Sequence, residues 1–195
     1  MTVGGKFLTN YLKDLISLRH LHIIDETHLA NQIKEDVSFV SSSFRQDIEK
    51  TWKGGLRDRR TLDPSIVIDY VLPDYTTVHR GYTRPHDATA MKTRNRALSQ
   101  PGQPREEVIP LGNERFVPAE LLFYPSDIGL QEAGLPEVVM QSLEALPEAL
   151  RPVMLANIMV VGGNSLIAGF MERLEREIRE NAPSEWMVRI KRADE

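Results

Sequence analysis

The chain has 195 residues, of which 41% are hydrophobic and 27% are charged, and this is the composition of an ordinary globular protein. Its length allows one large domain or two small ones. The formal net charge of -4 excludes a globally basic nucleic-acid binder, although it allows a local basic patch. Because the sequence has no cysteine, it excludes thiolate catalysis, sulfur-bound zinc and a disulfide framework, which fits a cytosolic or nuclear protein.

The sequence shows no sign of insertion into a membrane. No apolar run approaches the ~20 residues that a membrane helix needs. The N-terminus also lacks a basic segment followed by a short apolar core. We therefore expect no membrane partner and no secretory signal.

The first third of the chain is predicted to be helical. Apolar residues recur at helical spacing over residues 5–18, after a glycine pair that suits a helix start. A second helical stripe runs over residues 27–53, and the serines at 41–43 are a point where it would divide into two helices. Gly54-Gly55 then supplies a usual C-terminal stop.

The middle of the chain is predicted to be a β-hairpin with a long insert. Residues 66–72 are β-branched and bounded by prolines, which predicts a strand. Its predicted return is residues 76–78. Residues 80–107 have almost no large apolar side chains and contain several prolines, so we predict a flexible loop there.

Order is predicted to return at residues 108–111 and to continue to the end of the chain. Pro136 and Pro147 each precede a glutamate, which suits the first turn of a helix. Residues 187–190 alternate between apolar and polar side chains and predict a final strand. Together with the helices of the first third, these elements predict a mixed α/β fold.

A predicted strand at residues 158–161 ends in a glycine pair, Gly162-Gly163, and a helical pattern follows it. Two glycines let the backbone approach a ligand closely, because no Cβ stands in the way. A helix N-terminus directly after them would attract a phosphate. Judged locally, however, such a turn more often only reverses the chain.

No other local motif indicates catalysis or metal binding. The five histidines lack metal-ligand spacing, and the sequence has neither a nucleophile elbow nor a phosphate-binding loop. The carboxylates lie on predicted helices rich in opposite charge, where a solvated face is expected. We therefore predict no catalytic residue and no metal site.

Two polar features have both a functional and a plain interpretation. Lys34-Glu35 is either a solvent-facing pair or a clamp on the base or ribose of a nucleotide, since one residue donates and its neighbour accepts. The cations of the predicted insert would either contact DNA or a partner, or remain on a solvated loop that binds nothing. These cations are Arg80, Arg84, Lys92, Arg94 and Arg96.

Taken together, these segments resemble the C-terminal half of the actin family. The matches are collinear over nearly the whole chain and comprise residues 4–12, 33–35, 111–116 with their Asn-Glu-Arg-Phe signature, 122–126, and 155–164. The resemblance implies a partial actin-like (ribonuclease-H-like) ATPase fold, equivalent to actin subdomains 4 and 3, in which the first strands of the sheet are missing.

The resemblance also divides the chain into regions. It implies a helical subdomain resembling actin subdomain 4 over 1–64, a β-hairpin region over 65–79, a basic flexible insert over 80–107, and a partial subdomain 3 over 108–195. Without the first strands, the last two strands would expose edges and an apolar face. The chain alone is therefore expected to be marginally stable.

Half of a nucleotide site follows from the same resemblance. The residues that match base- or ribose-side positions are Gly5, Lys34, Glu35, Gly162, Gly163, Leu166 and Ile167. The arginine that neighbours the adenine in actin is Asn31 here. The family's phosphate-binding hairpins and catalytic glutamine would precede Met1, so we expect no cofactor for this chain and ATP or ADP only in a full-length parent.

Within the family, residues 33–41, 70–75 and 125–132 are closer to a nuclear actin-related branch than to actin. This implies a non-catalytic scaffold subunit of a Swr-type chromatin-remodelling complex, which exchanges a conventional histone for its variant. The expected partners are a zinc-finger subunit, the remodelling ATPase and the nucleosome, in the nucleus and also in the cytoplasm. The alternative is one lobe of an actin-like, ATP-binding cytoskeletal protein that forms filaments.

Overall fold

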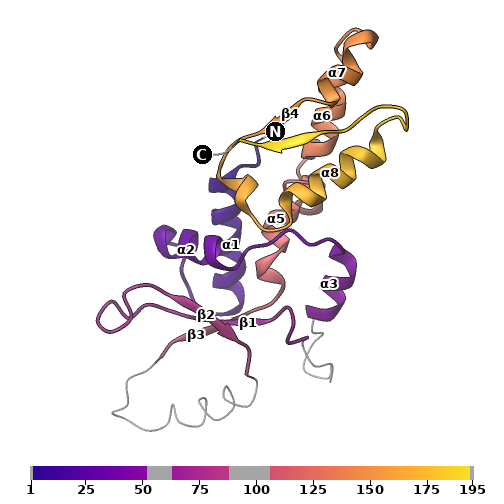
Figure 1. Cartoon of the computed structure of the whole chain (residues 1–195). Coiled ribbons are helices and arrows are strands. Elements are labelled where there is room, and N and C mark those ends of the chain that lie inside the picture. The colour runs from indigo at the N-terminus through magenta and orange to yellow at the C-terminus, as the bar shows by residue number, and fades with distance from the viewer. Residues whose placement is uncertain (1, 52–62, 88–105, 194–195) are drawn as a thin grey trace.

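The computed structural model describes residues 2–51, 63–87 and 106–193. These residues form two packed regions that helix α1 (Gly5–Arg19) connects, as Figure 1 shows. One region surrounds a three-stranded sheet, and the other contains the C-terminal helices and a small parallel sheet. Among the helices described, none is long and apolar enough to cross a membrane.

The secondary structure confirms the predicted mixture of helices and strands. The α-helices are α1, α2 (Thr27–Val37), α3 (Phe44–Thr51), α5 (Val117–Glu120), α6 (Leu135–Glu144), α7 (Arg151–Leu155) and α8 (Phe170–Asn181). The strands are β1 (Ile68–Val71), β2 (Tyr82–Pro85), β3 (Val108–Leu111), β4 (Ile158–Val160) and β5 (Ile190–Arg192). The 3-10 helices are η1 (Asn113–Arg115), η2 (Pro125–Ile128), η3 (Glu148–Leu150) and η4 (Gly163–Leu166).

The first packed region is the antiparallel sheet β2-β1-β3 together with α1 and α2. Strand β1 is central, so Tyr70 has Thr83 of β2 on one side and Ile109 of β3 on the other. The Tyr70 side chain is fully buried, in one apolar cluster with residues such as Ile16 of α1 and Ile33 of α2. The periodic apolar residues of the two helices thus cover one face of the sheet.

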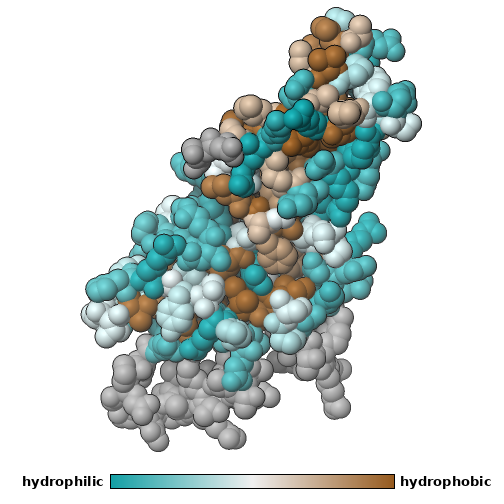
Figure 2. Space-filling view, viewed as in Figure 1, coloured by the Kyte–Doolittle hydropathy of each residue, from teal (hydrophilic) through white to brown (hydrophobic). Residues whose placement is uncertain are grey.

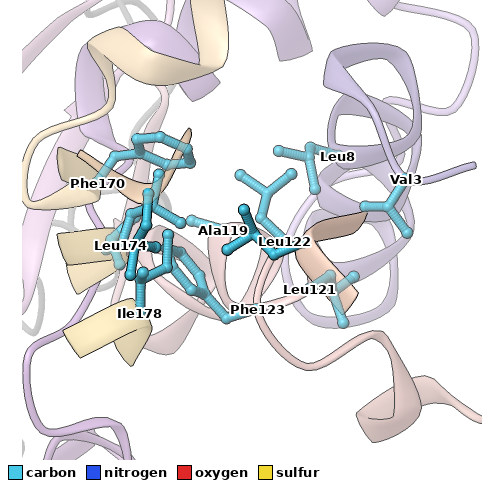
Figure 3. Packing of buried hydrophobic residues seen from close by; sticks show 12 residues of the cluster. Val3, Leu8, Ala119, Leu121, Leu122, Phe123, Phe170, Leu174 and Ile178 are labelled. Carbon is cyan, nitrogen blue, oxygen red and sulfur yellow. The ribbon is translucent and has the colours of Figure 1, made fainter. Parts of the chain in front are cut away.

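The second packed region is built on one face of α8. Phe170, Leu174 and Ile178 are one turn apart on that helix, and all three are buried. They pack against α5 and the segment that follows it, where the Phe123 ring lies 5.7 Å from the Phe170 ring between centroids (Figure 3). This cluster makes the hydrophobic core of the C-terminal half.

The Asn-Glu-Arg-Phe signature joins elements from both ends of the first region. Buried Glu114 accepts from Arg19 at 2.9 Å and from the Gly112 N–H at 2.9 Å. Burial alone would raise the pKa of Glu114, but hydrogen bonds from His20, backbone N–H groups and Arg19 outweigh burial and lower it. Arg115 donates to the carbonyls of Val37 and Ile66. The signature is therefore a structural junction between α1, α2 and the segment that leads into β1.

The predicted hairpin return at residues 76–78 is wrong. One carboxylate oxygen of Asp74 accepts the backbone N–H groups of residues 76, 77 and 78 at 2.7–2.9 Å, which closes a turn and removes these donors from any strand pairing. The return strand is β2, so the start of the predicted flexible insert is ordered. Of that insert, residues 88–105 lie outside the described residues, as does the Gly54-Gly55 stop.

The predicted division of residues 27–53 at the serines is confirmed, because residues 38–43 connect two separate helices, α2 and α3. Two other boundaries differ from those that periodicity predicts. The glycine pair leads into the short 3-10 helix η4 rather than directly into an α-helix, and α8 begins only at Phe170. The last strand is β5, which begins at Ile190 rather than at residue 187, and Arg179 donates to the Pro183 and Trp186 carbonyls and holds the turn that precedes it.

The parallel pair β4-β5 leaves apolar side chains uncovered. Within the described residues, β4 pairs with β5 alone. Met159 of β4 is 69% exposed and the following Val161 is 73% exposed. Further apolar side chains of α7 and its approach are exposed where Figure 2 shows brown at the top of the molecule, among them Val153 and Met154. An incomplete sheet with an exposed apolar face was the expectation, while the assignment to subdomains 4 and 3 stays a prediction.

A buried arginine connects three segments at the boundary of the two regions. Arg173 donates to the carbonyl of Ser41 at 2.6 Å, to Glu120 Oε1 at 3.0 Å, and to Glu177 Oε1 on its own helix. Glu120 is 2% exposed, and its other oxygen has no hydrogen-bond partner within the described residues. Burial raises the pKa of Glu120 to about 7, although the nearby guanidinium acts in the opposite direction.

We expect the isolated chain to be marginally stable and to unfold at a lower temperature than ordinary domains do, because its β4-β5 sheet exposes apolar side chains. Thermal unfolding of the monomeric chain, followed by circular dichroism, tests this expectation. A sharp transition near the ~45–65 °C midpoint of ordinary domains would contradict it.

We expect stability to fall as the pH rises from about 4.5 to about 7, because the folded state binds the Glu120 proton more tightly than the unfolded state does. The contribution is complete below the unfolded pKa and is lost as the pH passes the folded pKa. Glu120→Gln, which keeps a neutral side chain, should flatten this part of the profile. Apparent midpoints measured between pH 4 and pH 8 test it, with exposed Glu175→Gln as the control; equal slopes in both variants would refute it.

We expect Gly134→Ala to lower the free energy of unfolding by about 1–3 kcal/mol, the usual cost of overpacking. A Cβ on Gly134 would lie 1.7 Å from the carbonyl oxygen of Phe123, so the start of α6 would have to move. Gly163→Ala is the matched control, because a Cβ there has open space and the backbone has no positive φ. Urea titration of both variants measures the difference, and an equal loss would count against this account.

Candidate functional site

A cleft of about 900 Å³ lies between the first helices and the turn that follows β4. All of the residues that the sequence analysis assigned to a nucleotide half-site line it, although they are up to 162 positions apart in the chain. They are Gly5, Lys34, Glu35, Gly162, Gly163, Leu166 and Ile167. The structure therefore brings the whole set together, while its role in binding a nucleotide stays a prediction.

One wall of the cleft is the turn over residues 162–168. Ser165 closes it by donating its backbone N–H and its hydroxyl to the Gly162 carbonyl, at 3.0 and 2.7 Å. Gly162 has a φ of +107°, a conformation that favours glycine. A Cβ on either glycine of the pair would meet nothing within 4 Å, and Leu166 beside them is 56% exposed. The wall is thus an open backbone surface next to an apolar side chain.

The opposite wall is made by the start of α1 and the last turn of α2. Gly5 faces the other wall directly, because a Cβ there would lie 3.2 Å from Asn164 Oδ1. Lys34 and Glu35 come from α2, and Asn31 lies one turn before them on the same helix. The cleft is therefore built from segments at both ends of the chain.

Lys34 is directed into this wall and not into solvent. Its Nζ donates to Thr9 Oγ1 at 2.9 Å, to Asn31 Oδ1 at 2.9 Å and to the Gly5 carbonyl at 3.4 Å. Burial lowers the pKa of Lys34, and the neighbouring Glu35 opposes that shift. Because an ammonium group has three donors, residues of the chain itself use all of them.

Glu35 keeps one acceptor for a ligand. Its Oε1 accepts from Asn31 Nδ2 at 2.6 Å, and within the described residues no hydrogen bond reaches its other oxygen. A free carboxylate oxygen beside an open glycine surface suits the hydroxyls of a ribose and the flat face of a base. These groups suit a nucleoside but not its phosphates. Lys34 is the one cationic side chain among the described lining residues, and its N–H donors already bind other residues of the wall.

The functional interpretation of the glycine pair, a phosphate held at a helix N-terminus directly after it, does not fit the structure. The helix after the glycine pair begins seven residues later than Gly163, and its first turn does not line the cleft. Gly169, with a φ of +80°, precedes this helix, and a Cβ on it would lie 2.5 Å from the Val40 carbonyl. The helix start is therefore packed against the linker between α2 and α3.

The cations predicted to contact DNA are engaged where the structure describes them. Arg80 forms an ion pair with Asp36 at 2.8 Å, and Asp36 also accepts from the hydroxyl of Tyr70 at 3.1 Å. Arg84 lies in β2 and pairs with Glu106 at 2.9 Å. Lys92, Arg94 and Arg96 lie outside the described residues. Within the described part of the chain, no group of side chains has the arrangement of a metal site.

Sequence reasoning did not identify Thr9 and Asn164 as residues of this site. Thr9 is 3% exposed, accepts from Lys34 and donates to the Gly5 carbonyl at 2.9 Å. Its spacing of four from Gly5 on one helix was the available signal. Asn164 followed the noted glycine pair directly, but only the close approach of α1 shows that it lines the cleft.

We expect Thr9→Val to destabilise the chain by about 1–3 kcal/mol, because it leaves a buried donor of Lys34 without its acceptor. The matched control is Thr27→Val, which removes an exposed hydrogen bond from Lys13 and should cost about 0.5 kcal/mol or less. Urea titration of both variants tests this, and equal losses would show that the buried network adds nothing.

Comparison with known proteins gives a consistent relationship. The family model described as Actin matches residues 1–195. Actin-like protein arp6 of Emericella nidulans is 50% identical over 98% of this chain and 41% of its own length, and Actin-like protein arp6 of Aspergillus fumigatus is 47% identical over 98% and 42%. Actin-related protein 6 of Drosophila melanogaster is 43% identical over 96% and 43%. The chain thus spans about two fifths of the length of these curated relatives.

Proposed function

The chain belongs to the actin family, and from this premise we propose that it is part of a non-catalytic, actin-related scaffold subunit of a chromatin-remodelling complex. The relatives named as actin-related protein 6 support this assignment, because their similarity extends over almost the whole chain. The same resemblance supports a Swr-type complex that exchanges a conventional histone for its variant, and it supports a nuclear location.

The observation that carries the non-catalytic part of the proposal is the state of Lys34. Its three donors are bound to Thr9, Asn31 and Gly5, so it offers nothing to a phosphate. Catalysis of phosphate transfer needs cations or metal ions that stabilise the developing charge. In this proposal the cleft holds at most the nucleoside side of ATP or ADP, and the protein acts by contacts with a zinc-finger subunit, the remodelling ATPase and the nucleosome.

Affinity purification of the full-length protein that carries this chain tests the scaffold role. We expect a tagged protein from nuclear extract to co-purify with a remodelling ATPase and a small zinc-finger protein, in fixed stoichiometry and after nuclease treatment. An untagged strain is the control. Co-purification with cytoskeletal proteins and without remodeller subunits would contradict the proposal and favour the filament-forming alternative.

Calorimetry with ATP and with adenosine tests the account of the cleft. We expect this chain to bind ATP no better than adenosine, and neither with micromolar affinity, because the one cationic side chain among the described lining residues, Lys34, already donates to other residues of the wall. Micromolar binding of ATP would overturn this account, and a large preference for ATP over adenosine would show that phosphate contacts exist in the chain.

A further inference from the structure

A second pocket, of about 440 Å³, lies between the segment that follows α5 and the helices α6 and α8, which run side by side in Figure 1. It shares no lining residue with the nucleotide cleft. Its apolar surface comes from residues such as Tyr124 and Met140, and the described lining contains four glutamates and neither lysine nor arginine. A concave site that combines several apolar side chains with one sign of charge has the features of a binding pocket.

A close backbone contact fixes the position of α6 at one side of this pocket. Gly134 lines it and approaches the carbonyl of Phe123 so closely that no side chain fits between them. The neighbouring Leu135 N–H donates to the Leu122 carbonyl at 2.9 Å, which fixes the start of α6 over the segment after α5. The pocket is therefore part of the packed fold and not a gap between loose side chains.

The base of the pocket carries a buried carboxylate with an unused oxygen. The side chain of Glu177 is only 9% exposed, yet it lines the pocket. Its Oε1 accepts from Arg173, and within the described residues no hydrogen bond reaches Oε2. Arg173 also pairs with buried Glu120, so one guanidinium is shared by two carboxylates. Because Glu177 lines the pocket and its second oxygen keeps its acceptor capacity, a donor that enters the pocket can bond to that oxygen.

The rim of the pocket adds further negative charge. Glu144 has no side-chain partner within the described residues, and Glu137 accepts one hydrogen bond, from Gln141 at 3.0 Å. Glu132 accepts two hydrogen bonds from Thr2, which lower its pKa and keep it charged. Because four carboxylates share this concave surface and no described lining residue is a lysine or arginine, the pocket attracts cations and repels phosphates.

We propose that this pocket binds an arginine side chain that a basic segment of a partner protein presents. A planar guanidinium has five donors, pairs with carboxylates at two points, and stacks on aromatic rings, which a lysine ammonium does less well. The Tyr124 ring is 45% exposed, and Arg173 already lies beneath the same segment with its Cζ 5.9 Å from this ring. The pocket thus offers a guanidinium an apolar surface, a ring and several acceptors.

The test uses fluorescence anisotropy of the full chain with a labelled peptide of three Gly-Arg-Gly-Ser repeats, and with the matching lysine peptide. The pocket variant is Glu137→Gln with Glu144→Gln, both at exposed rim positions. The control variant is Glu172→Gln with Glu175→Gln on α8, which removes the same net charge from exposed positions outside the pocket. A third variant, Met140→Lys, places a cation inside the pocket.

We expect the pocket variant to weaken binding of the arginine peptide about tenfold and the control variant less than about twofold. Met140→Lys should abolish binding, and the lysine peptide should bind more weakly than the arginine peptide. The proposal is overturned if the parent chain does not bind the arginine peptide, if both double variants weaken binding equally, or if the lysine peptide binds equally well. The proposed remodeller function is judged by co-purification, so either idea can fail without the other.

Discussion

The guanidinium of Arg173 donates to three segments that the sequence keeps far apart, namely the linker carbonyl of Ser41, Glu120 of α5, and Glu177 of α8. Each of these partners is almost fully buried. Removing one member of a buried charge network typically costs about 3–5 kcal/mol, because the remaining charge has lost its partner. Arg173 therefore stabilises the packing of the linker and α5 against α8, together with the apolar cluster of that helix.

The position of the linker then determines the geometry of the cleft. Next to Ser41, the N–H of Val40 donates to the Ala168 carbonyl at 2.8 Å, and Phe39 pairs with Ala168 as an isolated bridge. This contact ties the end of α2 to the turn that carries Gly162. The two walls of the cleft, which come from opposite ends of the chain, are held at one distance by backbone hydrogen bonds that Arg173 supports.

The same network also underlies the second pocket. Glu177 uses one oxygen for Arg173 and turns its side chain toward the pocket between α6 and α8. Phe123 and Tyr124, which line that pocket, lie over the guanidinium at 5.3 and 5.9 Å. Structural and binding roles are therefore coupled, since a cation that enters the pocket approaches carboxylates whose charge Arg173 only partly balances. In the nucleotide cleft the charged group is already paired, because Asn31 and Thr9 accept hydrogen bonds from Lys34 within the wall.

Local patterns in the sequence determined the elements whose signal is short-range. Apolar periodicity predicted α1 and most of α2, and β-branched runs predicted β1 and β4. The collinear family motifs identified the half-site residues before any geometry was known, and all of them line one cleft. These features are readable because each depends on neighbouring residues or on a linear motif.

Only the tertiary structure decided the features that depend on distant partners. The carboxylate of Glu177 was expected on a solvated helix face and no pattern singled out Glu120, but both are buried, and Arg173 donates to both of them and to the Ser41 carbonyl. The return strand of the hairpin is β2 and not residues 76–78, because the Asp74 carboxylate accepts the backbone N–H groups of those residues. A sequence states which groups need partners, but packing decides which of them receive one, since burial sets the cost of every group left unpaired.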